Sequence, residues 1–461
     1  EIDVIDAINV FCCCVDDHRC RRTFFRWRSA AAGYPRRTDA IDELDRRKHC
    51  LHDDSGYRRQ LYWRQASLMG LRILAIAPTS FFADYGCHVR ILEEIRALAR
   101  RGHHTTLCTY HTGRTPADID VVRMPRVPWA SSIRIGSSMH KLYFDLLLGV
   151  RSLVASMGPV DVVHAHLHEG AAIGLVVSKL RRIPLVFDYQ GSLTREMLDH
   201  RFLSEGSPLI RPLEWIERAI ERSADAIITS SAHGASHLRA GHAHPLRRVT
   251  VIPDGIGHGG SSTAGITNAT TRALRDRLGI PEGRKVVGYL GLLADYQGVD
   301  HILYAARQVI ERRPDVHFLV MGYPGLEQYR RQAFDLQILG HVTFTGRVPY
   351  EDAPAHLALA DIAVSAKRSA TEANGKLLNY MDAGLPTVVY DTPVAREMLG
   401  DLGTYVPPGD VTGLADAIDS ILDDADRRTH LAAALRARVR TTFSWDDASA
   451  RLEAEYARVL G

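Results

Sequence analysis

Cysteine is scarce along most of this chain. Only Cys87 and Cys108 lie beyond the first 50 residues, and the other five are Cys12, Cys13, Cys14, Cys20 and Cys50. This distribution excludes a disulfide framework and fits a reducing compartment. The early cysteines with His18 resemble a zinc cluster, but adjacent cysteines share one tetrahedral ion poorly and paired C-x-x-C spacing is missing. We therefore predict no metal there.

Long apolar runs are also missing. A membrane-spanning helix needs about 20 apolar residues, and the longest candidate, around Leu142–Val150, is short and flanked by charge. The start, Glu1-Ile2-Asp3, lacks the basic and apolar regions of a secretory signal. We therefore expect a cytoplasmic protein.

The net charge is small. A charge of +3 over 461 residues argues against a dedicated nucleic-acid binder. The stretch from Leu71 to Thr270 carries about five excess positive charges, which would favour an anionic lipid or a phosphate-bearing acceptor.

Residues 1–68 lack sustained helix or strand periodicity and are rich in arginine. Met69-Gly70 then directly precedes a strong strand, Leu71–Ala77. We predict that the folded protein starts near Met69 and that residues 1–68 are a disordered or non-native extension. An extra binding arm is the alternative.

From Leu71 onward, short apolar strands alternate with amphipathic helices, and 461 residues suit two domains. Residues 255–270 are rich in Gly, Ser, Thr and His and read as a linker. This alternation predicts an α/β fold with two Rossmann-like, doubly wound domains that face each other across a cleft, over residues 69–265 and 271–443. The predicted strands are 71–77, 105–109, 160–164, 185–188, 226–229 and 249–252, and then 285–290, 316–321, 342–345, 362–365, 387–390 and 403–406.

The stretch Ser365–Pro386 is the most informative part of the sequence. A strand ends at Ser365, a polar loop follows, and a helix opens near Gly375. Glycine permits close approach of a ligand, and the amides at a helix start attract anions. Glu372 stands just ahead of that start. A capped helix with solvated charges is the simpler alternative.

This stretch resembles the donor-binding signature of the family 4 retaining glycosyltransferases of the GT-B fold, whose helix end "A-M-A-x-G-x-P" is similar to Met381–Pro386. The resemblance extends over nearly all of Leu71–Gly461. The weaker matching blocks are Gly102-His103, Asp161–His166, Val249–Ile256, Thr343–Val348 and Phe443–Trp445. By this resemblance the last helix, 444–461, packs back on the first domain.

The resemblance implies a nucleotide-sugar site in the second domain. Glu372 and Lys376 take catalytic roles, with Glu372 on the sugar hydroxyls. The family's second glutamate, which grips the ribose, falls on Asn379, whose contact lacks charge. The implied donor-binding residues are Gly86, Gly291, Gln297, Gly322, Arg347, Val348, Lys367, Asn374, Gly375, Leu377 and Asn379.

The chain departs from the family in one important loop. The family's "GRLxxxKG" block supplies an Arg and a Lys to the leaving diphosphate, whereas this chain has Leu292 and Gln297 there. Because stabilising that charge is usually the largest electrostatic contribution, other cations must replace them. We expect Lys376, or Lys367 with Arg368; a solvated loop pair is the alternative for the latter two.

The resemblance also places an acceptor side in the first domain. Its candidates are His166, His168, Glu169, Asp188 and Gln190. The family's glycine pair is reduced to Tyr85-Gly86, and a histidine of many relatives is Gln190. His164, His166 and His168 share one side of a strand and invite a metal interpretation, but no carboxylate is evident at ligand spacing, so we predict no metal.

We therefore expect retaining transfer of a sugar from a UDP-, GDP- or ADP-sugar, with no obligatory cofactor, as in polysaccharide biosynthesis. The acceptor would be a glycan, a lipid-linked saccharide or a small molecule. The aromatic and basic segment Trp129–Tyr143 suggests peripheral contact with the inner membrane face, although a buried loop fits equally. A nucleotide-sugar 2-epimerase and a non-catalytic nucleotide-sugar-binding subunit remain the alternatives.

Overall fold

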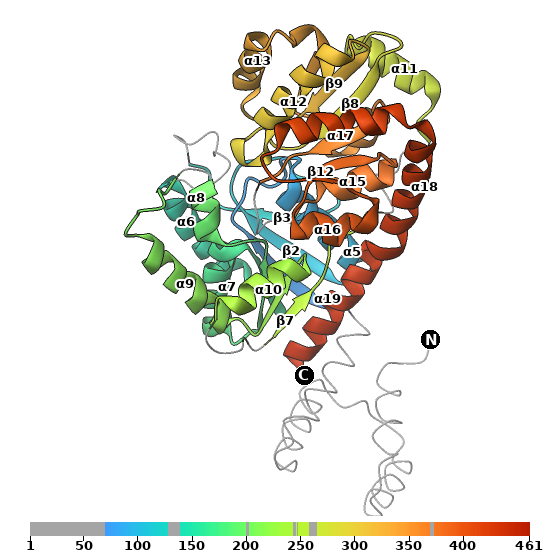
Figure 1. Cartoon of the computed structure of the whole chain (residues 1–461). Helices are drawn as coiled ribbons and strands as arrows, with labels where there is room; N and C mark the ends of the chain where they lie inside the picture. Colours follow the sequence, from blue (N-terminus) through green and yellow to red (C-terminus); the bar gives the residue numbers. More distant parts are fainter. Residues whose placement is uncertain are drawn as a thin grey trace, which may run out of the picture. The chain divides into compact units, whose positions relative to one another are not determined.

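The computed structural model describes residues 70–127, 139–199, 202–242, 246, 248–257, 265–368 and 373–461. The predictions for residues 1–68, including their five cysteines, and for Trp129 lie outside these ranges. Within them the chain forms two parallel sheets, each covered by helices on both faces (Figure 1). No helix in the described ranges has the length and hydrophobicity that a bilayer crossing requires.

The first domain is built on seven parallel strands in the order β3-β2-β1-β4-β5-β6-β7. The strands are β1 Arg72–Ala77, β2 His104–Thr109, β3 Asp120–Arg123, β4 Val162–His166, β5 Leu185–Tyr189, β6 Ala226–Thr229 and β7 Val249–Val251. The helices are α5 Gly86–Arg100, α6 Met139–Ala155, α7 Leu167–Arg181, α8 Leu193–Asp199, α9 Ile210–Ser223 and α10 Ala232–Ala240.

The second domain repeats this plan with six parallel strands in the order β10-β9-β8-β11-β12-β13. The strands are β8 Lys285–Leu290, β9 Val316–Met321, β10 Val342–Gly346, β11 Ile362–Ser365, β12 Thr387–Tyr390 and β13 Thr404–Val406. Its helices are α11 Asn268–Arg277, α12 Val299–Arg312, α13 Leu326–Asp335, α14 Ala353–Leu357, α15 Lys376–Ala383, α16 Pro393–Leu399, α17 Val411–Asp423 and α18 Ala425–Thr442. One more helix, α19 Trp445–Leu460, ends the chain.

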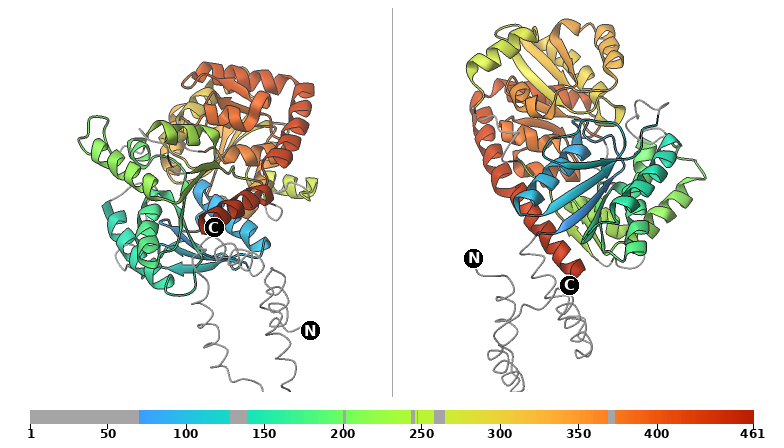
Figure 2. Two further views of the ribbon diagram at one scale, coloured as in Figure 1. Left: turned by 90° about the horizontal axis from the view of Figure 1, so that it is seen from below. Right: turned by 180° about the vertical axis from the view of Figure 1, so that it is seen from behind.

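Burial on both sheet faces explains why the strands are nearly continuous apolar runs. Strands β4 and β5 are buried at every residue, as expected for parallel strands with helices above and below. In the first domain α6, α7 and α9 cover one face and α5 and α19 cover the other (Figure 2). The predicted α/β fold with two Rossmann-like domains is confirmed.

The last helix belongs to the first domain's core although it follows the second domain in sequence. α19 packs against α5, and its Trp445, Leu452 and Tyr456 are buried against β1, β4 and β6. The two chain crossings also touch, because the Ile256 amide donates to the Phe443 carbonyl at 2.9 Å. The two segments that connect the domains therefore lie side by side.

In both sheets the strand order reverses next to the first strand, between β1 and β4 and between β8 and β11. Ligands of such sheets bind beyond the carboxyl ends of the strands at this switch point. The loops after β1, β5, β8 and β11 are therefore where a site is expected.

Candidate functional site

A cavity of about 600 Å³ opens at these strand ends and is lined by both domains. Most of the predicted donor residues line it, namely Gly86, Gly291, Gln297, Gly322, Arg347, Val348, Lys367, Asn374, Gly375, Lys376 and Asn379. Leu377 does not, because it is fully buried in the core of the second domain. Glu372 lies outside the described residues.

The start of α15 faces the cavity. Gly375 is the N-cap residue of this helix, and no side chain accepts a hydrogen bond from the first amides. A Cβ added at Gly375 would meet only Asp254 Oδ2, at 3.7 Å. Asn374 beside it is 5% exposed and donates to Ser365 Oγ at 3.2 Å, while its Oδ1 has no hydrogen-bond partner. This helix start has space for an anion, and aligned peptide dipoles favour one.

Lys376 reaches Gln297, the residue at the position where the resemblance implied a lysine. Its Nζ lies 2.5 Å from Gln297 Oε1 and 4.7 Å from the centroid of the Tyr289 ring. The side chain therefore extends back from α15 to the loop after β8, where the family's block places its cation. An ammonium group at that position can pair with phosphate oxygens.

Two glycines make room for this arrangement. Gly291 has φ +154°, and a Cβ there would lie 3.0 Å from Lys376 Nζ. Gly322, after β9, would place a Cβ 1.8 Å from the Gly291 carbonyl oxygen. Neither position accepts a side chain without displacing its neighbours, so both glycines keep this part of the cavity floor open.

The two other candidate cations behave differently. Lys367 is 6% exposed, lines the cavity and donates to the Ala373 carbonyl at 2.6 Å. Arg368 turns away to the loop after β8, where it bonds the Asp295 carbonyl and lies 3.7 Å from Asp300. Lys367 therefore stays a candidate for the diphosphate, whereas Arg368 supports the loop.

Arg347 joins the two domains at the cavity's edge. Its Nε donates to Asp84 Oδ2 at 2.8 Å, and its guanidinium lies 5.3 Å from the Tyr323 ring centroid. Asp84 also accepts from Arg114, at 3.1 Å, and from the Tyr350 amide, at 3.0 Å. These bonds hold the loop after β1 against the second domain.

In the first domain, His168, Glu169 and Gln190 line the cavity, whereas His166 and Asp188 lie buried behind its wall. Glu169 lies 3.7 Å from Lys141 Nζ.

Arg90 of α5 explains why Asp188 is withdrawn from the cavity. Its Nε donates to both Asp188 oxygens, at 3.1 and 3.0 Å, and its Nη2 donates to Oδ1 at 2.9 Å. Arg90 also pairs with Asp254. Burial opposes ionisation of Asp188, but Arg90 and His166 outweigh it and hold the pKa of Asp188 far below its usual range. A carboxylate so stabilised is a poor general base.

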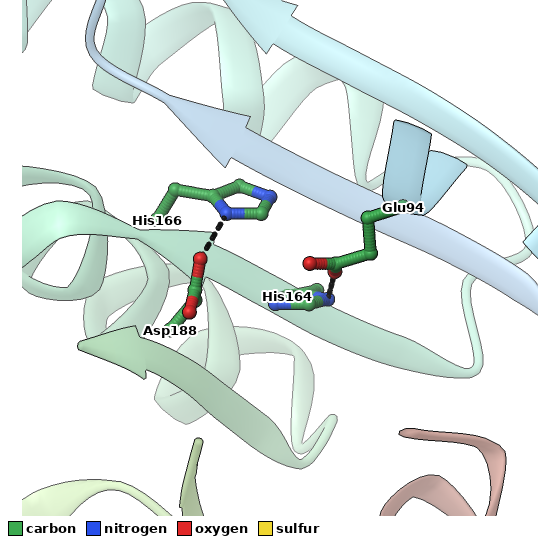
Figure 3. Close-up of side chains that lie close together, drawn as sticks. All are labelled: Glu94, His164, His166 and Asp188. Atoms are coloured by element: carbon green, nitrogen blue, oxygen red, sulfur yellow. Dashed lines mark hydrogen bonds and ion pairs between the residues drawn. The ribbon is translucent and has the colours of Figure 1, made fainter. Parts of the chain in front are cut away.

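Glu94, His164, His166 and Asp188 form a buried group whose ligand atoms all lie within 4.8 Å of one another (Figure 3). That spacing would suit a metal ion, but the Arg90 guanidinium already occupies the cationic position beside Asp188. Burial raises the pKa of Glu94 and lowers that of His164, so a neutral hydrogen-bonded pair fits their 3.1 Å contact. The contacts within this group are hydrogen bonds and ion pairs, and its two carboxylates correct the expectation that none lies at ligand spacing.

This network also anchors the last helix, because His164 Nδ1 lies 2.6 Å from the Tyr456 hydroxyl. Sequence reasoning missed Arg90 and Asp254. The available signal for Arg90 was a charged side chain between Val89 and Ile91, with Glu94 one turn later.

Comparison with known proteins finds a family model for each half of the chain. Residues 85–255 match the family model "Glycosyl transferase 4-like domain", and residues 270–438 match "Glycosyl transferases group 1".

Two curated relatives are similar to this chain over most of its length. The phosphatidyl-myo-inositol mannosyltransferase of Mycolicibacterium smegmatis is 25% identical over 85% of this chain and 95% of its own. The D-inositol 3-phosphate glycosyltransferase of Mycobacterium bovis is 27% identical over 86% of this chain and 84% of its own. Among solved structures, Anabaena HepE in complex with UDP and glucose has the same fold, with a TM-score of 0.66, 17% identity and coverage of 84% of this chain and 99% of that one.

Proposed function

This chain belongs to the glycosyltransferases of the GT-B fold that combine a glycosyl transferase 4-like domain with a group 1 domain. We propose that it transfers a sugar from a nucleoside diphosphate sugar to an acceptor hydroxyl with retention of configuration. The observation that carries the proposal is the start of α15, which no side chain caps, with Lys376 and Lys367 beside it in the cavity. This combination suits a diphosphate. The HepE complex, which contains UDP, supports the same donor class.

The proposed roles follow the cavity walls. The second domain binds the donor, with the diphosphate at Gly375 and Lys376 and the nucleoside toward Arg347 and Val348. Glu372 binds the sugar hydroxyls. The first domain presents the acceptor near Glu169.

In the proposed reaction the bond between the sugar C1 and the diphosphate oxygen breaks, and the acceptor oxygen bonds to C1 on the same face. The acceptor proton passes to the departing phosphate oxygen. This route needs no protein nucleophile or strong base, which fits the withdrawal of Asp188 by Arg90 and His166. Lys376 stabilises the charge that develops on the diphosphate.

The test is to incubate the purified protein with UDP-, GDP- and ADP-sugars and to measure nucleoside diphosphate release with and without acceptors. Glu372→Gln should lower turnover about 100-fold or more, whereas Glu327→Gln, on the exposed side of α13, should not. NMR of the product should show the donor's anomeric configuration. A sugar epimerised at C2 without acceptor, or binding without turnover, would support the alternative functions instead.

We also propose that the first domain rests on the cytoplasmic face of an anionic membrane. Leu142, Leu146 and Val150 of α6 are 69, 66 and 59% exposed, and α7 adds exposed Val176 and Leu180. The exposed charges of these two helices, among residues whose side chains are described, are cationic: Lys179 and Arg181. Apolar side chains with flanking cations suit an anionic bilayer.

Sedimentation with vesicles containing an anionic lipid tests this surface. Leu146→Asp should reduce binding to anionic vesicles, and added salt should weaken binding of the parent protein. Equal binding of parent and variant would exclude the surface. A salt-insensitive dimer that Leu146→Asp dissociates would assign it to a second copy of the chain.

A further inference from the structure

Among the described residues, the two walls of the cavity differ in charge. Among its described residues, the second-domain wall has Arg347, Lys367 and Lys376 and no carboxylate. The first-domain wall has two cations, Arg90 and Lys141, against four carboxylates: Asp84, Glu169, Glu196 and Asp254. An anionic donor suits the second-domain wall, and the first-domain wall must suit a different chemistry.

Both cations of the first-domain wall are already committed to carboxylates. Arg90 is 3% exposed and bonds Asp188 and Asp254. Lys141 Nζ lies 3.7 Å from Glu169 Oε1. Burial lowers the pKa of Lys141, but the carboxylates of Glu169 and two neighbours outweigh it and raise the pKa. Lys141 is therefore a cation held among several acidic groups.

Another acidic group stands behind this wall. Tyr110, which lines the cavity, donates its hydroxyl to Asp145 Oδ1 at 2.5 Å. The excess positive charge of the sequence between Leu71 and Thr270 therefore does not lie on this cavity wall. Each described Lys or Arg of the wall is already paired with a carboxylate, so none is left to bind the phosphate of the acceptor that the sequence suggested.

A phosphate monoester at this wall would meet like charges at short range, which is costly in a partly dry cleft. Carboxylates instead accept hydrogen bonds from the hydroxyls of a sugar or cyclitol ring. We propose that the acceptor is a polyhydroxylated ring that carries no phosphate, with Glu169 as the residue that selects it. This inference rests on the proposed function and deepens it.

The proposal separates this chain from the relatives named above, one of which acts on D-inositol 3-phosphate. The difference would arise on the first-domain wall alone, so the donor side need not change.

Matched acceptor pairs test the inference: myo-inositol against inositol 3-phosphate, and glucose against glucose 6-phosphate. Each is assayed with the nucleotide sugar that the protein hydrolyses. We expect kcat/KM at least tenfold higher for the unphosphorylated member of each pair. Glu169→Lys should reduce that preference or reverse it, and Glu169→Gln should reduce it less, whereas the control Glu327→Gln on the exposed side of α13 should leave the preference unchanged.

The two proposals fail in different ways. Absence of donor binding and hydrolysis would sink the proposed function. Donor hydrolysis with preferential transfer to the phosphorylated members, or with transfer to neither unphosphorylated one, would overturn the acceptor inference alone. A preference that Glu169→Lys leaves unchanged would remove Glu169 from it; thermal unfolding of each variant verifies that the fold is retained.

Discussion

Replacing Lys376 with methionine tests whether its ammonium group supplies the charge that the family's block lacks here. Its Nζ lies 2.5 Å from Gln297 Oε1, at the edge of the proposed diphosphate site. Methionine keeps the apolar stem but lacks the ammonium group, so one proposed contact with the phosphate should be lost. A hydrogen bond to a charged group contributes about 1.5–3 kcal/mol, which corresponds to a loss of about 10- to 150-fold in affinity. Titration calorimetry with the preferred nucleoside diphosphate measures this loss, and the parent nucleoside should bind unchanged.

The reciprocal change makes the test specific. Gln297→Lys in the Lys376→Met background returns an ammonium group to the same place from the opposite loop, and we expect most of the lost affinity to return. Arg330→Met is the matched control, because Arg330 lies on the exposed side of α13 and outside the cavity. Full diphosphate affinity in Lys376→Met would refute the reasoning, and so would an equal loss of nucleoside binding.

Two further predictions concern the buried charges. Arg90→Met should lower the free energy of unfolding by about 3–5 kcal/mol, because it removes the cation that compensates the buried Asp188 and its neighbour Asp254; Arg100→Met on the same helix should cost less than about 1 kcal/mol, and equal urea midpoints would contradict this. Burial raises the pKa of Asp145 to about 7, so its protonated form stabilises the fold below pH 4 and that contribution is lost as the pH rises through about 7. Asp145→Asn should flatten this part of the stability profile by up to about 1.4 kcal/mol per pH unit; superimposable melting profiles of parent and variant would count against it.

Elements with a strong apolar pattern could be predicted from the sequence. The bounds 285–290, 316–321, 362–365 and 387–390 were predicted as the structure has them, because each strand is a short and mostly apolar segment. The strand predicted at 160–164 instead runs to His166, because buried histidines continue it. Strand β3 and helix α18 were missed: β3 is a four-residue edge strand with Asp120 and Arg123 at its ends, and α18 buries only Leu431, Leu435 and Val439.

The site residues could likewise be predicted only in part. Residues near one another in sequence, such as Asn374 to Lys376, could be assigned to one loop and helix start. Arg90 could not be assigned, because its partner Asp254 is 164 positions away. The withdrawal of Asp188 from the cavity follows from such distant pairing.

A crystal structure with the preferred nucleoside diphosphate tests the central claim most directly. The account predicts the β-phosphate within hydrogen-bond distance of Lys376 Nζ and of the backbone at Gly375, with the nucleoside beside Val348. A diphosphate bound elsewhere in the cavity, with Lys376 still bonded to Gln297 alone, would contradict it.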